Sequence, residues 1–152
     1  NICRSPMAEA VARRTLADQW PDRRLRIASR GTAAFNAGKP ADPRALAALR
    51  ASGYDPVPHI ARQIDDADFS AFGHIIAMDR ANLVTLTGWT PAGFPGRIRL
   101  LPARNGAGIE VPDPFHADAD AFHHVLRLIE KGTRTLLEEV LGPPSMNPAG
   151  HP

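Results

Sequence analysis

Cysteine is almost absent from this sequence. Cys3 is the only one among 152 residues. A single thiol excludes an internal disulfide framework and any zinc site built from several cysteines. A lone thiol is typical of a reducing compartment, so we expect a cytoplasmic protein.

Long apolar runs and dense basic clusters are also missing. No stretch approaches the ~20 apolar residues of a membrane-spanning helix, which argues against a membrane protein. The basic residues are scattered and the net charge is only +2. Nothing therefore resembles the basic stripe of a nucleic-acid-binding protein.

The length and the hydrophobic fraction of 43% are typical of one globular domain. We expect this domain to span residues 1–141. The last segment, GPPSMNPAGHP (142–152), is polar and rich in proline. Such a terminus is predicted to be a disordered tail.

The pattern along the chain predicts helices alternating with short strands. Ser5 is expected to cap a first helix with Pro6 at its first position. Further helices are expected to begin near Asp42 and at Asp79, and a long amphipathic helix at Asp118. The predicted strands are Leu25–Ser29, His74–Met78 and Arg97–Leu101. This alternation predicts an α/β domain with a parallel sheet.

The opening NICRSP combines groups that bind anions. A helix N-terminus offers free N–H groups and a positive dipole end. Arg4 adds a guanidinium, Ser5 a hydroxyl and Asn1 an amide that can brace the loop. A thiol at such a site is expected to have a lowered pKa, although a lone cysteine is also typically a small buried apolar residue.

Five short segments in order resemble the low-molecular-weight protein tyrosine phosphatase family. NICRSP resembles the end of its phosphate loop, C-x-G-N-I-C-R-S-P, and SRGTAAFNAGKPADPRA resembles its S-x-G-T…P-D-P-R-A segment. HIARQ, MDRANL and VPDPF resemble its H-x-A-R-Q, M-D-x-x-N-L and D-P-Y segments. Within this family, the chain resembles the bacterial-type phosphatases.

The resemblance implies a three-layer, doubly wound parallel sheet of about four strands in flavodoxin-like order. It also implies a nucleophilic cysteine three residues upstream of Asn1. Cys3 would then be the auxiliary thiol beside it. We therefore expect the chain to be truncated at its N-terminus within the phosphate-binding loop, to lack the first strand, and to be inactive because the nucleophile is absent.

The resemblance assigns roles to several residues. Arg4 would bind phosphate, Ser5 would donate to the thiolate, and Asn1 would brace the loop. Asn1, Ile2 and Cys3 would form the phosphate-binding site together with Arg4. The supporting pair would be Ser29 and His59.

Asp113 in VPDPF would be the general acid, since phosphoryl transfer to a thiol needs a proton for the leaving phenol oxygen. Asp-Pro is also a common turn dipeptide. Phe115 stands where many members have tyrosine, so it keeps an aromatic wall but offers no hydroxyl to phosphorylate. Phe35 would form a second wall, or simply pack its loop. Ile2 indicates phosphotyrosine, because phosphoarginine phosphatases have threonine there.

The acids and histidines between Asp113 and His124 fit no zinc spacing, so we expect no metal and no other cofactor. The first functional hypothesis is a cysteine-dependent phosphotyrosine phosphatase. Its partner would be a phosphotyrosine protein, a tyrosine kinase among the candidates, and the chain would be a monomer or weak dimer. A phosphotyrosine-binding pseudo-phosphatase is the alternative. A thioredoxin-coupled arsenate reductase is disfavoured, because its relay needs further cysteines.

Overall fold

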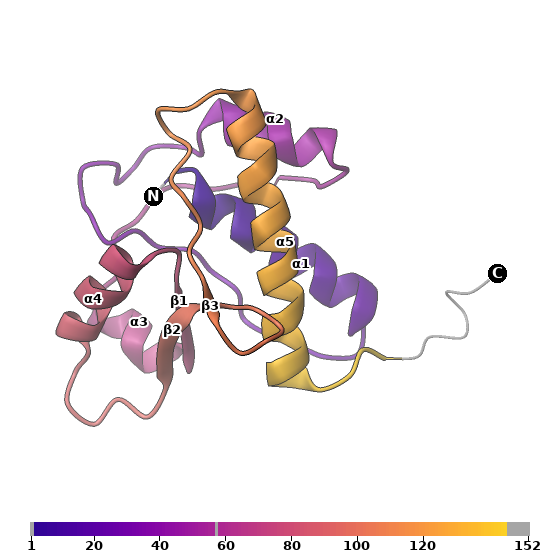
Figure 1. Cartoon of the computed structure of the whole chain (residues 1–152). Coiled ribbons are helices and arrows are strands. Elements are labelled where there is room, and N and C mark those ends of the chain that lie inside the picture. The colour runs from indigo at the N-terminus through magenta and orange to yellow at the C-terminus, as the bar shows by residue number, and fades with distance from the viewer. Residues whose placement is uncertain (1, 57, 146–152) are drawn as a thin grey trace.

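The computed structural model describes residues 2–56 and 58–145 (Figure 1). The elements in chain order are α1 (Arg4–Gln19), α2 (Pro43–Ala51), α3 (Asp66–Ala71), β1 (His74–Ala77), α4 (Arg80–Trp89), β2 (Arg97–Pro102), β3 (Gly108–Ile109) and α5 (Ala119–Leu141). The predicted α/β class is confirmed, because helices alternate with strands and β1 pairs in parallel with β2.

The sheet is small and mixed, with the order β1-β2-β3. β1 and β2 are parallel, with Ile75 opposite Ile98. The short β3 pairs antiparallel to β2, with Ile109 opposite Leu101. β3 was not predicted from the sequence, because two residues are too few to show an alternating pattern of apolar and polar side chains.

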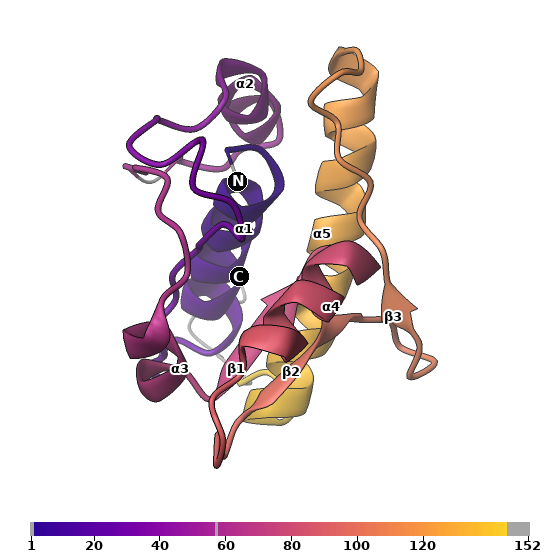
Figure 2. The same ribbon diagram turned by 90° about the vertical axis from the view of Figure 1, so that its left-hand side faces the viewer.

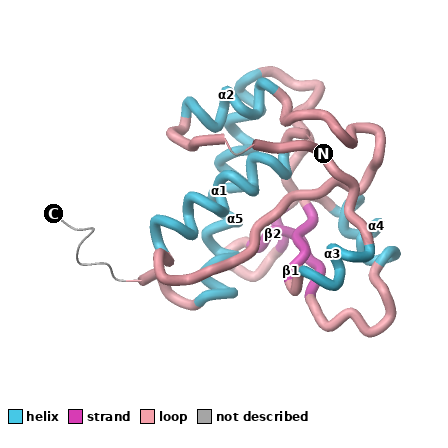
Figure 3. The backbone as a smooth tube through the Cα atoms, turned by 180° about the vertical axis from the view of Figure 1, so that it is seen from behind, coloured by secondary structure: helices cyan, strands magenta, loops and turns pink. Residues whose placement is uncertain are grey.

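The predicted strand at Leu25–Ser29 is wrong. The connection that follows α1 is loop over this segment, as Figure 3 shows. A strand exists only where a neighbour completes its hydrogen-bond ladder. In the described part of the chain, no ladder forms along Leu25–Ser29.

Each face of the sheet covers a separate core. Leu101 belongs to a cluster with α1, α2 and α5, whereas its neighbour Leu100 joins a cluster under α3 and α4. This split follows from the strand period of two, which sends successive side chains to opposite faces. Figure 1 shows the strands between α4 and α5, and Figure 2 shows α2 beside the first turns of α1. The result is a three-layer arrangement.

Three predicted helix starts are confirmed, and one is wrong. Asp42, Asp79 and Asp118 each accept a hydrogen bond from a backbone N–H in the first turn of α2, α4 and α5. Ser5 does not cap α1, because that helix already begins at Arg4, where Met7 N–H donates to the Cys3 carbonyl. Pro6 is tolerated there because the first N–H groups of a helix have no intrahelical acceptor.

The start of the predicted tail is attached to the domain. The buried Trp20 indole donates to the carbonyls of Gly142 (3.2 Å) and Pro143 (3.1 Å). The Ser145 N–H donates to the Gln19 carbonyl at 2.9 Å. The rest of the predicted tail, 146–152, lies outside the described residues. Among the residues described, no helix is long and apolar enough to span a bilayer.

Gly132 lets α5 approach β2 closely. A Cβ atom at this position would overlap the side chain of Leu101, which is buried in the core. We expect Gly132→Ala to lower the free energy of unfolding by about 1–3 kcal/mol, the usual cost of overpacking. Urea denaturation measures this change. Gly88→Ala is the matched control, because nothing lies within 4 Å of its added Cβ; equal stability of the two variants would contradict the close approach.

Candidate active site

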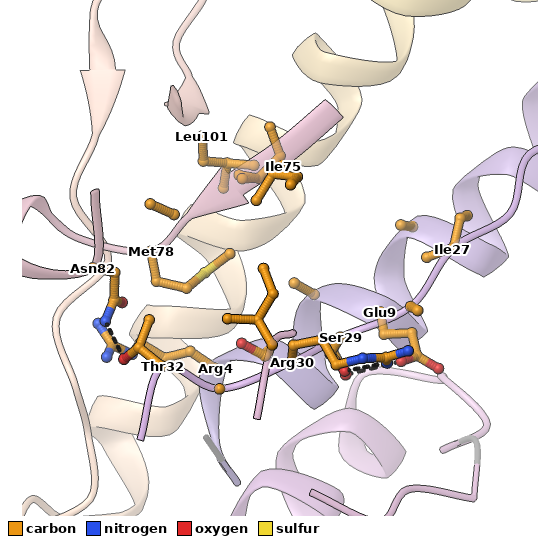
Figure 4. A pocket seen from close by; sticks show the side chains of 18 of the residues that line it. Arg4, Glu9, Ile27, Ser29, Arg30, Thr32, Ile75, Met78, Asn82 and Leu101 are labelled. Carbon is orange, nitrogen blue, oxygen red and sulfur yellow. Dashed lines mark hydrogen bonds between the residues drawn. The ribbon is translucent and has the colours of Figure 1, made fainter. Parts of the chain in front are cut away.

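A cavity of about 750 Å³ runs along β1 from Gly73 to Met78. One end is formed by the start of α1, and the opposite wall by the loop segment 25–33. Asp113 and Phe115 close the same end from the loop that precedes α5. Figure 4 shows Arg4, Thr32, Met78 and Asn82 gathered at one side of the cavity. The first turn of α1 and the loop before α5 therefore share one hollow.

Arg4 is buried at this end of the cavity, with 6% of its surface exposed. Its Nη1 donates to Asp79 Oδ2 at 2.7 Å and to the Val111 carbonyl at 2.8 Å. Its Nε is also buried and has no acceptor among the described residues. Buried N–H groups of folded proteins are nearly always paired. The Nε–H of Arg4 therefore indicates that an acceptor belongs here.

Asp79 fixes the Arg4 guanidinium from the carboxyl end of β1. Burial disfavours its charge, but hydrogen bonds from the Asn82 N–H and from Arg4 outweigh burial and lower its pKa. Asp79 is therefore an anion that holds one side of the guanidinium and leaves the Nε edge unused.

The other residues of NICRSP lie around Arg4. Ser5 is the second residue of α1 and lines the cavity. Ile2 also lines it and packs against the larger core. Asn1 lies outside the described residues, so its predicted bracing role stays a prediction.

Cys3 corrects the expectation of a lowered pKa. Its side chain is 2% exposed, and burial, followed by the charges of Asp42 and Asp113, raises its pKa to about 12. Desolvation disfavours the thiolate more than the nearby guanidinium groups favour it. Cys3 is therefore a protonated thiol at neutral pH and a poor nucleophile. Its burial agrees with the alternative expectation of a small buried residue.

Asp113 lies exposed in the loop between β3 and α5, where its Oδ1 accepts a hydrogen bond from the Phe115 N–H at 3.1 Å. Val111 anchors this loop beside Arg4: its N–H donates to the Met78 carbonyl at 2.7 Å, and its carbonyl accepts from Arg4. The carboxylate and the guanidinium therefore lie at the same cavity, as predicted.

Two aromatic side chains stand at the cavity. Phe115 is 40% exposed and Phe35 is 77% exposed, although both line it. An exposed aromatic ring beside a polar hollow can stack against a flat ligand. The two predicted aromatic walls are thus brought to the same cavity as Arg4 and Asp113.

The predicted supporting pair is also brought together. Ser29 Oγ lies 3.4 Å from His59 Nδ1 and donates to Glu9 Oε1 at 2.9 Å (Figure 4 shows the second contact). Glu9 was missed in the sequence, where it reads as one half of an i,i+4 ion pair with Arg13.

Candidate metal ligands do not form a cluster in the described part of the chain. In residues 2–56 and 58–145, no group of three or more histidine, cysteine or acidic side chains is arranged to hold an ion. Asp118, one of the acids considered in the sequence, caps α5 instead.

The family model described as "Low molecular weight phosphotyrosine protein phosphatase" matches residues 1–142. The chain belongs to this family. A low molecular weight protein-tyrosine-phosphatase of Streptomyces coelicolor is 37% identical over 145 residues, which cover 92% of this chain and 88% of that protein. The mouse low molecular weight phosphotyrosine protein phosphatase is 43% identical over 142 residues, covering 91% and 89%.

A solved structure supports the same family. The protein tyrosine phosphatase of Entamoeba histolytica superposes with a TM-score of 0.85 at 30% identity, covering 92% of this chain and 90% of that one. The chain therefore shares the fold of this family as well as its sequence pattern.

Two contacts near the cavity were not foreseen. The Asp79 ion pair with Arg4 was missed because Asp79 was read as a helix cap and as part of a family segment, without a partner. Arg44 was missed because ADPR was read as a helix start within a family segment, yet Arg44 donates to the Phe115 carbonyl. The position of Asp79 directly after a buried strand was the available signal, since ligands gather at the carboxyl ends of parallel strands.

Proposed function

We propose that the complete gene product hydrolyses phosphotyrosine in proteins through a phosphocysteine intermediate. The observation that carries this proposal is the buried Arg4 Nε–H, which has no acceptor among residues 2–56 and 58–145, in a cavity that Asp113 and two phenylalanines also line. A phosphoryl oxygen would supply the acceptor, since a guanidinium fork matches phosphate geometry. The substrates would be phosphotyrosine proteins, among them tyrosine kinases.

The nucleophile would be a thiol three residues before Asn1, as in the family's loop. The raised pKa of Cys3 supports this assignment, because a thiol with a pKa of about 12 supplies almost no thiolate at neutral pH. Ser5 at the start of α1 would donate to the upstream thiolate, and Asn1 would brace the loop. Ser29 and His59 would support it from the side.

The chemistry would run in two steps. The thiolate attacks phosphorus and forms the S–P bond, while the P–O bond to the phenol breaks and the departing oxygen takes a proton from Asp113. Water then attacks phosphorus and gives a proton to Asp113, while the S–P bond breaks, so that inorganic phosphate leaves and the thiolate is restored. Arg4 and the N–H groups at the start of α1 would stabilise the phosphoryl oxygens in both steps.

The aromatic walls support a preference for phosphotyrosine. Phe115 and Phe35 would hold the substrate ring, and Ile2 supports phosphotyrosine over phosphoarginine. Because Phe115 has no hydroxyl, it could not be phosphorylated for regulation. We further propose that no metal or other cofactor takes part, and that the protein acts in the cytoplasm as a monomer or weak dimer.

The cavity along β1 supports a missing first strand. β1 lies at the edge of the sheet and is paired only with β2 within the described residues. The cavity separates it from segment 25–33. A strand that precedes Asn1 would pair with β1 and fill this space, giving the sheet of about four strands that the family implies.

The experiment compares two proteins: the complete gene product and the chain that begins at Asn1. We expect the first to hydrolyse p-nitrophenyl phosphate in the presence of EDTA and to be blocked by vanadate, and the second to show no turnover. Turnover by the chain from Asn1 would mean that the wrong thiol has been assigned. Binding of phosphotyrosine peptide without turnover by the complete protein would favour the pseudo-phosphatase. Thioredoxin-dependent arsenate reduction would favour the reductase.

A further inference from the structure

Arg44 contacts both Asp42 and the loop that carries Asp113 and Phe115. It lies in the first turn of α2 and is partly exposed. Its Nε and Nη2 contact Asp42 Oδ1 and Oδ2 at 3.1 and 2.9 Å, the two-pronged geometry of an arginine–carboxylate pair. Hydrogen bonds from Arg44 outweigh burial and hold the pKa of Asp42 below its usual value. The direction of the Arg44 side chain is therefore fixed from its own helix.

Asp42 links the Arg44–Asp42 ion pair to the segment before α1. Its N–H donates to the Ile2 carbonyl at 2.8 Å, and only 7% of its surface is exposed. A movement at Arg44 would therefore be transmitted to the residues that precede Arg4.

The Arg44 guanidinium also donates hydrogen bonds to the loop that carries Asp113. Nη2 donates to the Phe115 carbonyl at 2.8 Å and Nη1 to the Ala117 carbonyl at 3.3 Å. The guanidinium carbon also lies 5.4 Å from the Phe115 ring centre and 4.8 Å from that of Phe122 on α5. These contacts fall directly after Asp113, whose carboxylate accepts from the Phe115 N–H. Arg44 thus fixes the turn that carries this carboxylate.

We propose that Arg44 is a positioning residue that holds Asp113 over the phosphoryl site, so that its loss weakens proton donation to the leaving group. This proposal rests on the proposed phosphatase function. Lysine cannot replace arginine in this role, because one ammonium does not reproduce the planar fork that reaches Asp42 and two carbonyls together.

The kinetic experiment uses leaving groups of different acidity with the complete gene product. Phenol, with a pKa of about 10, needs a proton to depart, whereas dinitrophenol does not. We expect Arg44→Ala and Arg44→Lys to lower kcat/KM for phenyl phosphate about 10-fold more than for dinitrophenyl phosphate. Arg50→Ala, an exposed arginine at the other end of α2, is the matched control. The ratio between substrates does not depend on the fraction of folded protein, so an unchanged ratio would overturn the proposal.

A double-mutant cycle separates positioning from general damage. If Arg44 acts through Asp113, adding Arg44→Ala to Asp113→Asn should cause almost no further change in that ratio. Fully additive effects would overturn the proposal.

Hydrogen exchange gives a readout that needs no turnover. The amides of Phe115 and Ala117 should exchange about 10-fold faster in Arg44→Ala than in Arg50→Ala, because the loop opens more often. Equal exchange would overturn the role of Arg44 even if the protein is a phosphatase. Absent turnover in the parent protein would instead refute the phosphatase function.

Discussion

Replacing Arg4 with lysine should lower kcat/KM for aryl phosphates about 1,000-fold, within the range that a transition-state arginine contributes in phosphoryl transfer. Lysine keeps the positive charge beside Asp79 but loses the fork whose Nε edge is unused in the structure. Steady-state kinetics of the complete gene product measure this loss. Arg134→Lys, on the exposed side of α5, is the matched control and should keep full activity.

The same substitution can be followed without catalysis. Orthophosphate should raise the melting temperature of the parent protein, because a ligand that binds only the folded state stabilises it by mass action. Arg4→Lys should lose most of this rise. A variant that is still stabilised by orthophosphate would show that the anion binds elsewhere.

Asp113→Asn is expected to have the second-largest effect. An amide keeps the size and the hydrogen bond from the Phe115 N–H but cannot transfer a proton. General acid catalysis contributes about 100- to 10,000-fold, so kcat/KM for a phosphotyrosine peptide should fall within that range. Affinity for orthophosphate should stay close to that of the parent, because Arg4 still provides the guanidinium.

Asp120→Asn is the control for this substitution, since Asp120 is an exposed acid in the first turn of α5. It should leave turnover unchanged. If both variants lost activity equally, the effect would come from charge near α5 and Asp113 would not be the proton donor.

The sequence predicted most of the fold because local rules are strong in this chain. Helices were expected to begin near Asp42, at Asp79 and near Asp118, and all three aspartates cap a helix in the structure. The strand at His74–Ala77 was found from its continuous apolar run, although only Ala77 of its four residues is buried. Leu25–Ser29 carries a similar signal, but strand formation depends on a neighbour and not on the segment alone.

The site was only partly predictable, because long-range contacts leave little trace in one sequence. Arg4, Asp113, Phe35 and Phe115 were identified through motifs, and all line one cavity. The partner of Arg4, Asp79, lies 75 residues further along the chain. The pKa of Cys3 could not be read from neighbouring residues either, since burial outweighs the adjacent arginines.

The attachment of Gly142–Ser145 has a practical consequence for fluorescence experiments. Trp20 is enclosed where the end of α1 meets this segment, whereas the other tryptophan, Trp89, is 44% exposed. With Trp89 changed to phenylalanine, emission would come from Trp20 alone. Detachment of Gly142–Ser145 would admit water to that indole and shift its emission to longer wavelength. The fluorescence of Trp20 would therefore report whether this segment is attached.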